Sequence, residues 1–144
     1  MKASCKNILG YGILLFVLFL ASCTSNEDDS ITPVDDRDDY IGTWSCAENS
    51  SKSGPSTFDV VIRKNVNESN QLLMDNFYLL GSTHFAVITK SGNSLSLATQ
   101  SVSGNTVQGS GNIVSNSKIN LSYSVNDGSG SGGIDNCTAV LTKK

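Results

Sequence analysis

The chain has 144 residues, a formal net charge of −3 at pH 7 and 38% hydrophobic residues. From residue 40 onward basic and acidic side chains nearly balance, so this part lacks the positive stripe that contact with a phosphate backbone requires. The composition therefore predicts one domain of ordinary size that does not bind nucleic acid.

The first twenty-two residues have the pattern of a secretory signal peptide. Lys2 and Lys6 precede an apolar run from about Ile8 to Leu20. This run is too short to cross a bilayer as a helix, and small residues follow it, as at a cleavage site. We therefore exclude residues 1–22 from the folded protein.

The residues around Cys23 read Leu-Ala-Ser-Cys. This motif resembles the lipobox of bacterial lipoproteins. The resemblance implies cleavage just before Cys23 and acylation of its thiol and new amino group, with diacylglycerol and palmitate as the attached groups. Each buried methylene adds about 0.8 kcal/mol of membrane affinity, so two or three acyl chains make release negligible.

Residues 24–39 are strongly acidic, with Arg37 as the one base. The acids are Glu27, Asp28, Asp29, Asp35, Asp36, Asp38 and Asp39. So few apolar residues and so many like charges predict a disordered tether over residues 23–39. An acidic cluster after the lipidated cysteine also resembles the signal that exports some Gram-negative lipoproteins to the outer face of the outer membrane; a solvated spacer explains the same residues.

Short runs with apolar residues at every second position fill the rest of the chain, residues 40–144, and Gly, Ser and Asn separate them. They predict eight strands: Ile41–Glu48, Thr57–Asn65, Gln71–Phe77, His84–Lys90, Ser94–Gln100, Thr106–Val114, Lys118–Val125 and Ile134–Thr142. Short turns between them favour pairing of consecutive strands. The expected fold is an all-β antiparallel meander.

Cys46 and Cys137 lie on the first and last predicted strands. Strand alternation directs both inward, and two cysteines of an exported domain usually pair in an oxidising compartment. A disulfide would require adjacent first and last strands, and so a closed barrel. Zinc is the alternative reading, but a site needs about four ligands and His84 is the single histidine. We expect no metal site and no cofactor.

Gly42-Thr43-Trp44, at the start of this meander, resembles the Gly-x-Trp motif of lipocalins and related calycins. The resemblance implies a small lipocalin-like barrel whose tryptophan closes one end beneath a basic residue near the last strand. Lys143 or Lys144 would fill that position. It also implies a small apolar ligand inside the barrel.

The predicted interior is too bulky to favour such a ligand. Its members include Trp44, Phe58, Val60, Ile62, Leu95, Leu97, Val107, Ile113, Ile119, Leu121, Tyr123 and Leu141. Gly109 and Gly111 also face inward, where they make room for an aromatic ring across the barrel or relieve strand curvature. An eight-stranded barrel is just wide enough for side chains to fill, so we expect a filled core.

The sequence offers no catalytic set. His84 is the one imidazole, and the acids of the domain are scattered: Glu48, Asp59, Glu68, Asp75, Asp127 and Asp135. A serine nucleophile would require a partner base. We therefore expect a non-catalytic binding module and not an enzyme.

Two segments are candidate binding surfaces. Residues 126–133 form a Gly/Ser-rich loop with Asp127, Ser129 and Ser131. In composition it resembles the loop that small lipid-anchored inhibitors present to host lysozyme, so an enzyme inhibitor is one alternative. Phe77 and Tyr78 either cap a barrel end or form an exposed entrance for a small apolar ligand, the other alternative. The partner, whether protein, glycan or small apolar ligand, is not identified.

Overall fold

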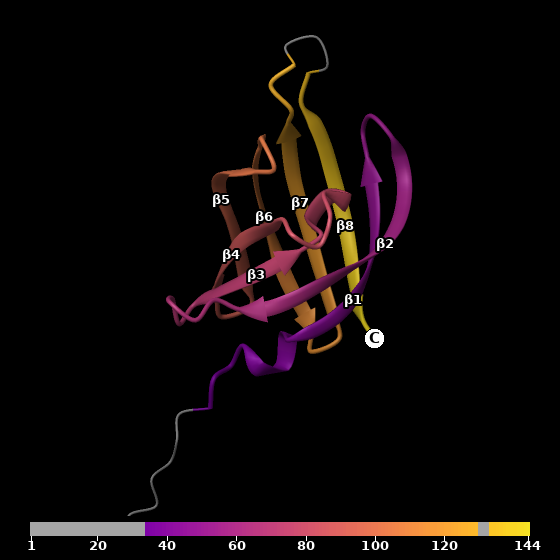
Figure 1. Cartoon of the computed structure of the whole chain (residues 1–144). Helices are drawn as coiled ribbons and strands as arrows, with labels where there is room; N and C mark the ends of the chain where they lie inside the picture. Colours follow the sequence, from indigo (N-terminus) through magenta and orange to yellow (C-terminus); the bar gives the residue numbers. More distant parts are fainter. Residues whose placement is uncertain (1–33, 130–132) are drawn as a thin grey trace, which may run out of the picture. The chain divides into compact units, whose positions relative to one another are not determined.

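The computed structural model describes residues 34–129 and 133–144; the signal peptide, Cys23 and Ser131 lie outside these residues. Eight strands form one closed antiparallel barrel in which each strand pairs with the next and the last with the first (Figure 1). The strands are β1 (Gly42–Ser50), β2 (Gly54–Lys64), β3 (Gln71–Asp75), β4 (Phe85–Ser91), β5 (Ser94–Val102), β6 (Asn105–Ser115), β7 (Lys118–Asn126) and β8 (Asp135–Lys143). The predicted closed eight-stranded meander is confirmed.

Alternation of buried and exposed residues places the core inside the barrel. Along β7, buried residues occupy every second position from Ile119 to Val125. The strand predicted to reach Phe77 ends instead at Asp75. The next residue, Asn76, has φ 58°, a left-handed conformation that cannot continue a strand.

The interior is filled by side chains, as expected. Trp44, Val107 and Leu141 have no exposed surface, and a cavity of about 10 Å³ lies between Phe58, Met74 and their neighbours. That volume is at the lower limit for one water molecule. The described interior therefore has no room for a small apolar ligand in this conformation.

Trp44 closes one end of the barrel. Its indole nitrogen donates a hydrogen bond to the carbonyl of Tyr40 at 2.9 Å. The ammonium of Lys143 lies 5.9 Å from the centroid of the indole ring and donates to the carbonyl of Asp39 at 2.6 Å. Of the two lysines that the sequence left open for this position, Lys143 therefore lies over Trp44, whereas Lys144 pairs with Asp59.

The end of the acidic segment is not a free tether, which corrects the predicted boundary at residue 40. Arg37 is only 7% exposed. One of its terminal nitrogens, Nη1, donates to the carbonyls of Asn65, Glu68 and Gln71 at 3.1, 2.7 and 3.0 Å. Asp35 accepts from the other side of the same guanidinium at 2.7 Å. The ordered domain therefore begins near Asp35.

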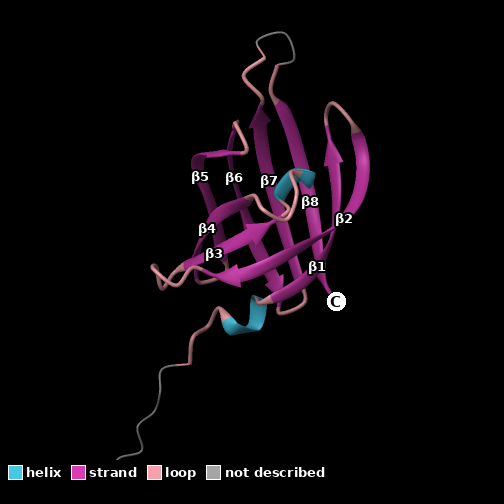
Figure 2. Ribbon diagram, viewed as in Figure 1, coloured by secondary structure: helices cyan, strands magenta, loops and turns pink. Residues whose placement is uncertain are grey.

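Ion pairs hold the acidic residues of this segment against the barrel. Asp35 and Asp38 both pair with Lys64, and Asp36 pairs with Lys90. A short 3₁₀ helix, η1 (Asp38–Tyr40), follows and lies under the same barrel end (Figure 2). Composition predicted repulsion among these acids, but basic partners from distant strands offset both the repulsion and the entropy of ordering. Among the described residues no helix is long and apolar enough to cross a membrane.

Candidate functional site

The two ends of the barrel are built differently. One end carries η1, the β2–β3 connection and the β6–β7 turn, and the N-terminal segment joins the barrel there (Figure 1). The opposite end, here called the distal end, carries the β1–β2 hairpin, the β3–β4 connection and the β7–β8 loop. Both segments predicted to bind a partner therefore lie at the distal end.

The β3–β4 connection closes the distal end as a plug, which we define as residues 76–80. It contains the short 3₁₀ element η2 (Phe77–Leu79). Phe77 is 1% exposed, and its ring centroid lies 4.6 Å from that of Tyr123. Phe77 therefore packs inward and caps this end, whereas Tyr78 is half-buried and Leu79 is 57% exposed.

A buried polar cluster lies beneath the plug. We call Glu48, Ser50, Tyr78, Tyr123 and Asp135 the mouth cluster. The Tyr123 hydroxyl donates to Glu48. Asp135, 1% exposed, accepts from the hydroxyls of Tyr78 at 2.7 Å and of Ser50 at 2.6 Å. The plug is therefore held by ring packing and by the bond from Tyr78 to Asp135.

The pKa values of the two carboxyl groups of the mouth cluster are shifted in opposite directions. Burial opposes ionisation of Asp135, but hydrogen bonds from Ser50, Tyr78 and Ser51 outweigh it and hold its pKa below the usual range. Burial raises the pKa of Glu48, and the hydrogen bond from Tyr123 offsets this only in part. From the sequence we expected these acids to be scattered. Strand alternation could have indicated that Glu48 is buried, because it places Glu48 on the same inward face as Trp44 and Cys46.

The raised pKa of Glu48 predicts a specific pH dependence. Because the folded state holds this proton more tightly than the unfolded state, Glu48 stabilises the fold below its unfolded pKa of about 4.3, and that contribution is lost as pH rises through the folded pKa. Glu48→Gln should remove this pH-dependent contribution, because an amide does not ionise. Urea unfolding from pH 4 to 7 measures the free energy of unfolding of the parent and the variant. The difference between them should change with pH, and the variant should gain stability relative to the parent as pH rises to 7.

The matched control is Glu68→Gln, since Glu68 is exposed. If the difference in unfolding free energy between Glu48→Gln and the parent does not change with pH, the raised pKa of Glu48 is contradicted. The charge of Asp135 also raises the pKa of Glu48, so the pH-dependent difference reports the burial of Glu48 together with its interaction with Asp135.

The predicted disulfide between Cys46 and Cys137 is not formed. Both residues are buried and face inward on adjacent strands, as expected, but both thiols are free. The register pairs Cys46 with Leu141 and Cys137 with Ser50. Four residues along a strand correspond to about 13 Å, whereas a disulfide needs Cα atoms within about 7 Å. The barrel is closed by the β1–β8 hydrogen bonds instead.

Free buried thiols should be inert in the folded protein. Burial, followed by the nearby charge of Glu48, raises the pKa of both thiols to about 12, so little thiolate exists at pH 8. Ellman's reagent should detect neither thiol in the native state and both after denaturation in guanidinium. A linked peptide containing both cysteines, in non-reduced mass mapping, would contradict this structure.

The Gly/Ser-rich loop is exposed where the structure describes it. Asp127 accepts hydrogen bonds from the backbone N–H and the hydroxyl of Ser129 at 2.9 and 2.7 Å, and these bonds lower the pKa of Asp127. His84 lies in the β3–β4 connection, where its backbone bonds to Asn76 and Gly81. No three His, Cys, Asp or Glu side chains of the described residues are grouped to hold a metal ion.

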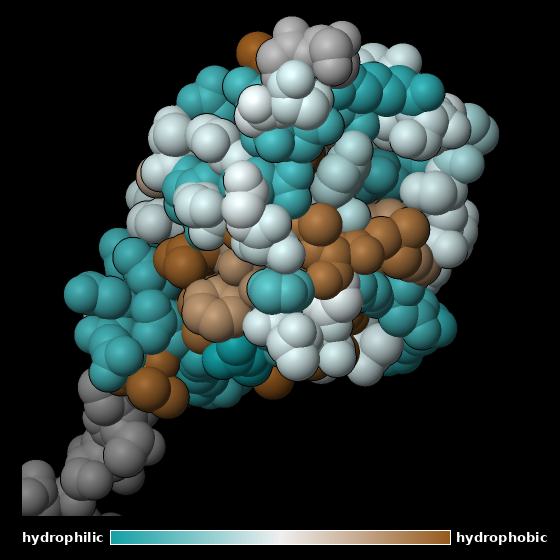
Figure 3. Space-filling model, turned by 45° about the horizontal axis from the view of Figure 1, so that its top comes forward, coloured by the Kyte–Doolittle hydropathy of each residue, from teal (hydrophilic) through white to brown (hydrophobic). Residues whose placement is uncertain are grey.

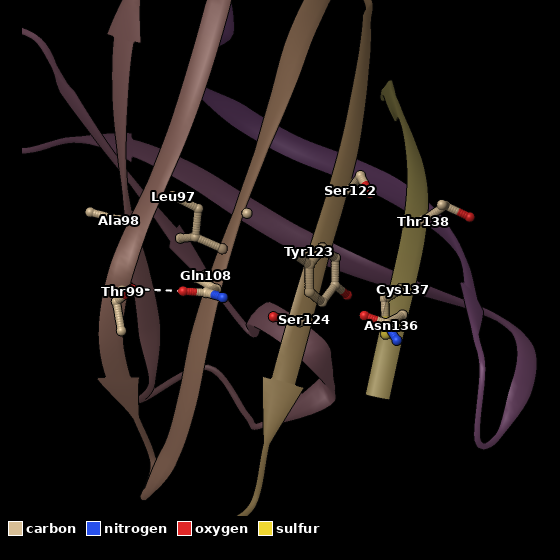
Figure 4. A pocket seen from close by; sticks show the side chains of 11 residues that line it. Leu97, Ala98, Thr99, Gln108, Ser122, Tyr123, Ser124, Asn136, Cys137 and Thr138 are labelled. Atoms are coloured by element: carbon tan, nitrogen blue, oxygen red, sulfur yellow. Dashed lines mark hydrogen bonds between the residues drawn. The ribbon is translucent and has the colours of Figure 1, made fainter. Parts of the chain in front are cut away.

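A shallow groove of about 500 Å³ runs along the outside of β5 to β8 (Figure 4). Its exposed side chains are small hydroxyl and amide groups, among them Thr99, Gln108, Ser122 and Thr138. Thr99 donates a hydrogen bond to Gln108 at 2.8 Å. These groups could accept or donate hydrogen bonds to a polar partner, but they contain no nucleophile paired with a base.

An apolar patch lies on the outer surface near the plug. Val61 and Phe85 both lie opposite Asp75 in the sheet, and each is 42% exposed. The guanidinium of Arg63 bonds to Asp75 and lies 5.0 Å from the centroid of the Phe85 ring. Figure 3 shows hydrophobic surface gathered in a band bordered by polar residues. This band is accessible to a partner, unlike the filled interior.

No protein-family model matches this chain, and no curated protein matches it. Its fold is similar to that of EF1p2_mFAP2b, solved bound to DFHBI, with TM-score 0.53 and 12% identity over 74% of this chain and 95% of that one. It is also similar to a redesigned beta barrel, b11L5F_LGL, with TM-score 0.53 and 11% identity over 74% and 93% of the two chains. At these identities the likeness shows the fold alone, a small closed β-barrel.

Proposed function

We propose that the protein is an outer-membrane lipoprotein, anchored through Cys23 and facing the cell exterior, whose barrel is a non-catalytic binding module. The Leu-Ala-Ser-Cys motif and the acidic residues after it support the anchor and its location. The barrel binds its partner through the loops of the distal end.

The observation that carries this proposal is the docking of the N-terminal segment. Arg37 and the acids around it hold the chain against the end opposite the plug and the β7–β8 loop. A lipid on Cys23 would therefore be joined to the barrel through that end. The loop with Asp127 and Ser129 and the exposed Leu79 of the plug would be left open to a partner.

Replacing Cys23 by Ala tests the anchor. The variant should leave the membrane fraction or accumulate unprocessed, because no acyl chains can be attached. Ser25→Ala, two residues away, is the control and should fractionate like the parent. Protease digestion of intact cells then tests exposure. Parent-like fractionation and maturation of the Cys23 variant would reject the anchor, and full protection of the barrel would reject its display outside.

Two classes of partner remain for the distal end. A protein partner, such as an enzyme that this module inhibits, is favoured by the filled interior, which leaves the exposed loops as the contact surface. A small-ligand carrier is favoured by EF1p2_mFAP2b, a barrel of similar fold that was solved with a small molecule. The carrier function requires the plug to move.

Binding assays with two variants separate these classes. Lysozyme, a glycan array and a lipid panel should be tested against the parent, a variant with a shortened β7–β8 loop, and a Phe77→Ser variant. Binding lost with the loop supports a protein-facing module, and binding changed only by Phe77→Ser supports a ligand beneath the plug. Turnover that disappears in His84→Ala would reject the non-catalytic assignment.

A further inference from the structure

The seam between β4 and β5 is paired over only part of its length. Backbone partners join Thr89, Lys90 and Ser91 to Ser96, Leu95 and Ser94. By comparison, β7 and β8 pair continuously from Lys118 to Val125. Beyond Thr89, toward the distal end, β4 and β5 have no register partners in the described structure.

A side chain bridges this open part of the seam. The amide oxygen of Gln100 accepts a hydrogen bond from the N–H of Val87 at 2.8 Å, and its amide nitrogen donates to the carbonyl of Val87 at 2.8 Å. In an antiparallel sheet, facing residues exchange this same pair of bonds through their backbones. The Gln100 amide therefore stands where the peptide group of a neighbouring strand would lie.

The position of Gln100 explains why it can reach the seam. A bulge between Leu97 and Gln100 shifts the register of β5 against β6. Gln100 lies opposite Val107, a buried residue, so its side chain starts from the inner face and turns toward β4. Two methylene groups separate its amide from its backbone, which keeps β5 farther from Val87 than a directly paired strand would be.

The backbones on both sides of the seam are oriented for further pairing. In β4 and just before it, His84 and Lys90 bond toward β3, so by alternation Phe85 and Val87 direct their N–H and C=O groups toward β5. In β5, Val102 pairs with Asn105 across a two-residue turn, so Ser101 directs its backbone groups away from β6. Two strand edges thus face each other across the seam.

A groove of about 390 Å³ lies along this seam, with Phe85, Val87, Gln100 and Ser101 among its lining residues. Phe85 and Val87 provide apolar contact on the outer side, and Phe85 also belongs to the apolar patch described above. The groove is therefore complementary to a chain with backbone donors and acceptors on both edges and an apolar side chain at every second position.

We propose that this seam binds an extended peptide segment of a partner protein, which enters between β4 and β5 as an additional strand and replaces the Gln100 amide at Val87. Main-chain hydrogen bonds supply affinity in such strand addition, and alternate side chains supply specificity. The eight described strands of a second copy are already paired in a closed barrel, so the occupant is a segment that lies extended outside a folded domain.

The probe is a labelled synthetic peptide with the sequence Ser-Leu-Ser-Leu-Ala-Thr-Gln-Ser-Val, which copies β5, the strand that already pairs with β4. It is titrated into the mature full chain in detergent and followed by fluorescence anisotropy. A second peptide carries N-methyl groups at alternate amides and cannot form the ladder. The first should bind and the second should not. Hydrogen exchange at the Ser101 amide should slow when the first peptide is bound.

Gln100→Ala should bind the peptide about tenfold more tightly, because the peptide no longer has to displace two hydrogen bonds. Gln108→Ala, a glutamine on the neighbouring strand outside the seam, is the control and should bind like the parent. If Gln100→Ala does not fold, Gln100→Glu replaces it, since a carboxylate cannot donate to the Val87 carbonyl and should also strengthen binding. Equal binding of both peptides, binding of neither, or unchanged affinity in the folded Gln100 variant would overturn the proposal.

Discussion

Replacing Phe77 by Ala is expected to lower the free energy of unfolding by about 3 to 5 kcal/mol. Phe77 is 1% exposed and packs against Tyr123, with ring centroids 4.6 Å apart. Its loss would enlarge the small cavity that Phe77 itself helps to line. The residues around it belong to separate strands of a closed barrel, so they can collapse into the space only in part.

Urea unfolding at pH 7, followed by the fluorescence of Trp44, measures this effect. Leu79→Ala is the matched control, because Leu79 belongs to the same plug but is 57% exposed. The free energy of unfolding of the Leu79 variant should stay within about 0.5 kcal/mol of that of the parent. The enlarged cavity of the Phe77 variant should also bind a small apolar molecule such as benzene, which would stabilise it. A loss below about 1 kcal/mol would show that the plug is not part of the core.

Replacing Gly109 by Ala is expected to cost about 3 kcal/mol. A Cβ at this position would overlap the carbonyl oxygen of Ser122 and lie 2.5 Å from the Cβ of Tyr123. Both atoms belong to the directly paired strand β7. They cannot retreat without breaking hydrogen bonds of the barrel and moving Tyr123, which donates to Glu48 in the mouth cluster.

Ser110→Ala is the control for Gly109→Ala, since Ser110 is the next residue of β6 and its side chain is exposed. In thermal unfolding, the melting temperature of the Ser110 variant should stay near that of the parent. The melting temperature of the Gly109 variant should fall by about ten degrees or more. Equal midpoints for the two variants would contradict the close approach of β6 and β7. A Tyr123→Gly change made together with Gly109→Ala removes the Cβ of residue 123 and should relieve part of the clash, a coupling that a double-mutant cycle measures.

Gly109 and Gly111 show what strand alternation alone can predict and what it cannot. Alternation placed Gly109 and Gly111 on the inner face and suggested space for a ring across the barrel. The side chains that need this space, Tyr123 and Leu121, belong to the adjacent strand and lie directly opposite the glycines. The face of a residue follows from its own position in the chain, but the identity of its neighbour depends on the register.

The cysteines and the acidic segment show the same limit. Inward parity and the adjacency of β1 and β8 were correct, yet a register offset of four residues separates Cys46 from Cys137. The charges of residues 35–39 were evident, but their partners Lys64 and Lys90 come from β2 and β4. No local pattern states which distant side chains a segment will meet.

The sequence by itself determined the eight strands, their inward faces and the tryptophan at one end. Each of these follows from a period of two residues or from a short motif. Only the tertiary structure decided the mouth cluster, the docking of Arg37 and the open seam bridged by Gln100. These features depend on strand register and on where loops far apart in the chain meet, and both result from packing the whole barrel at once.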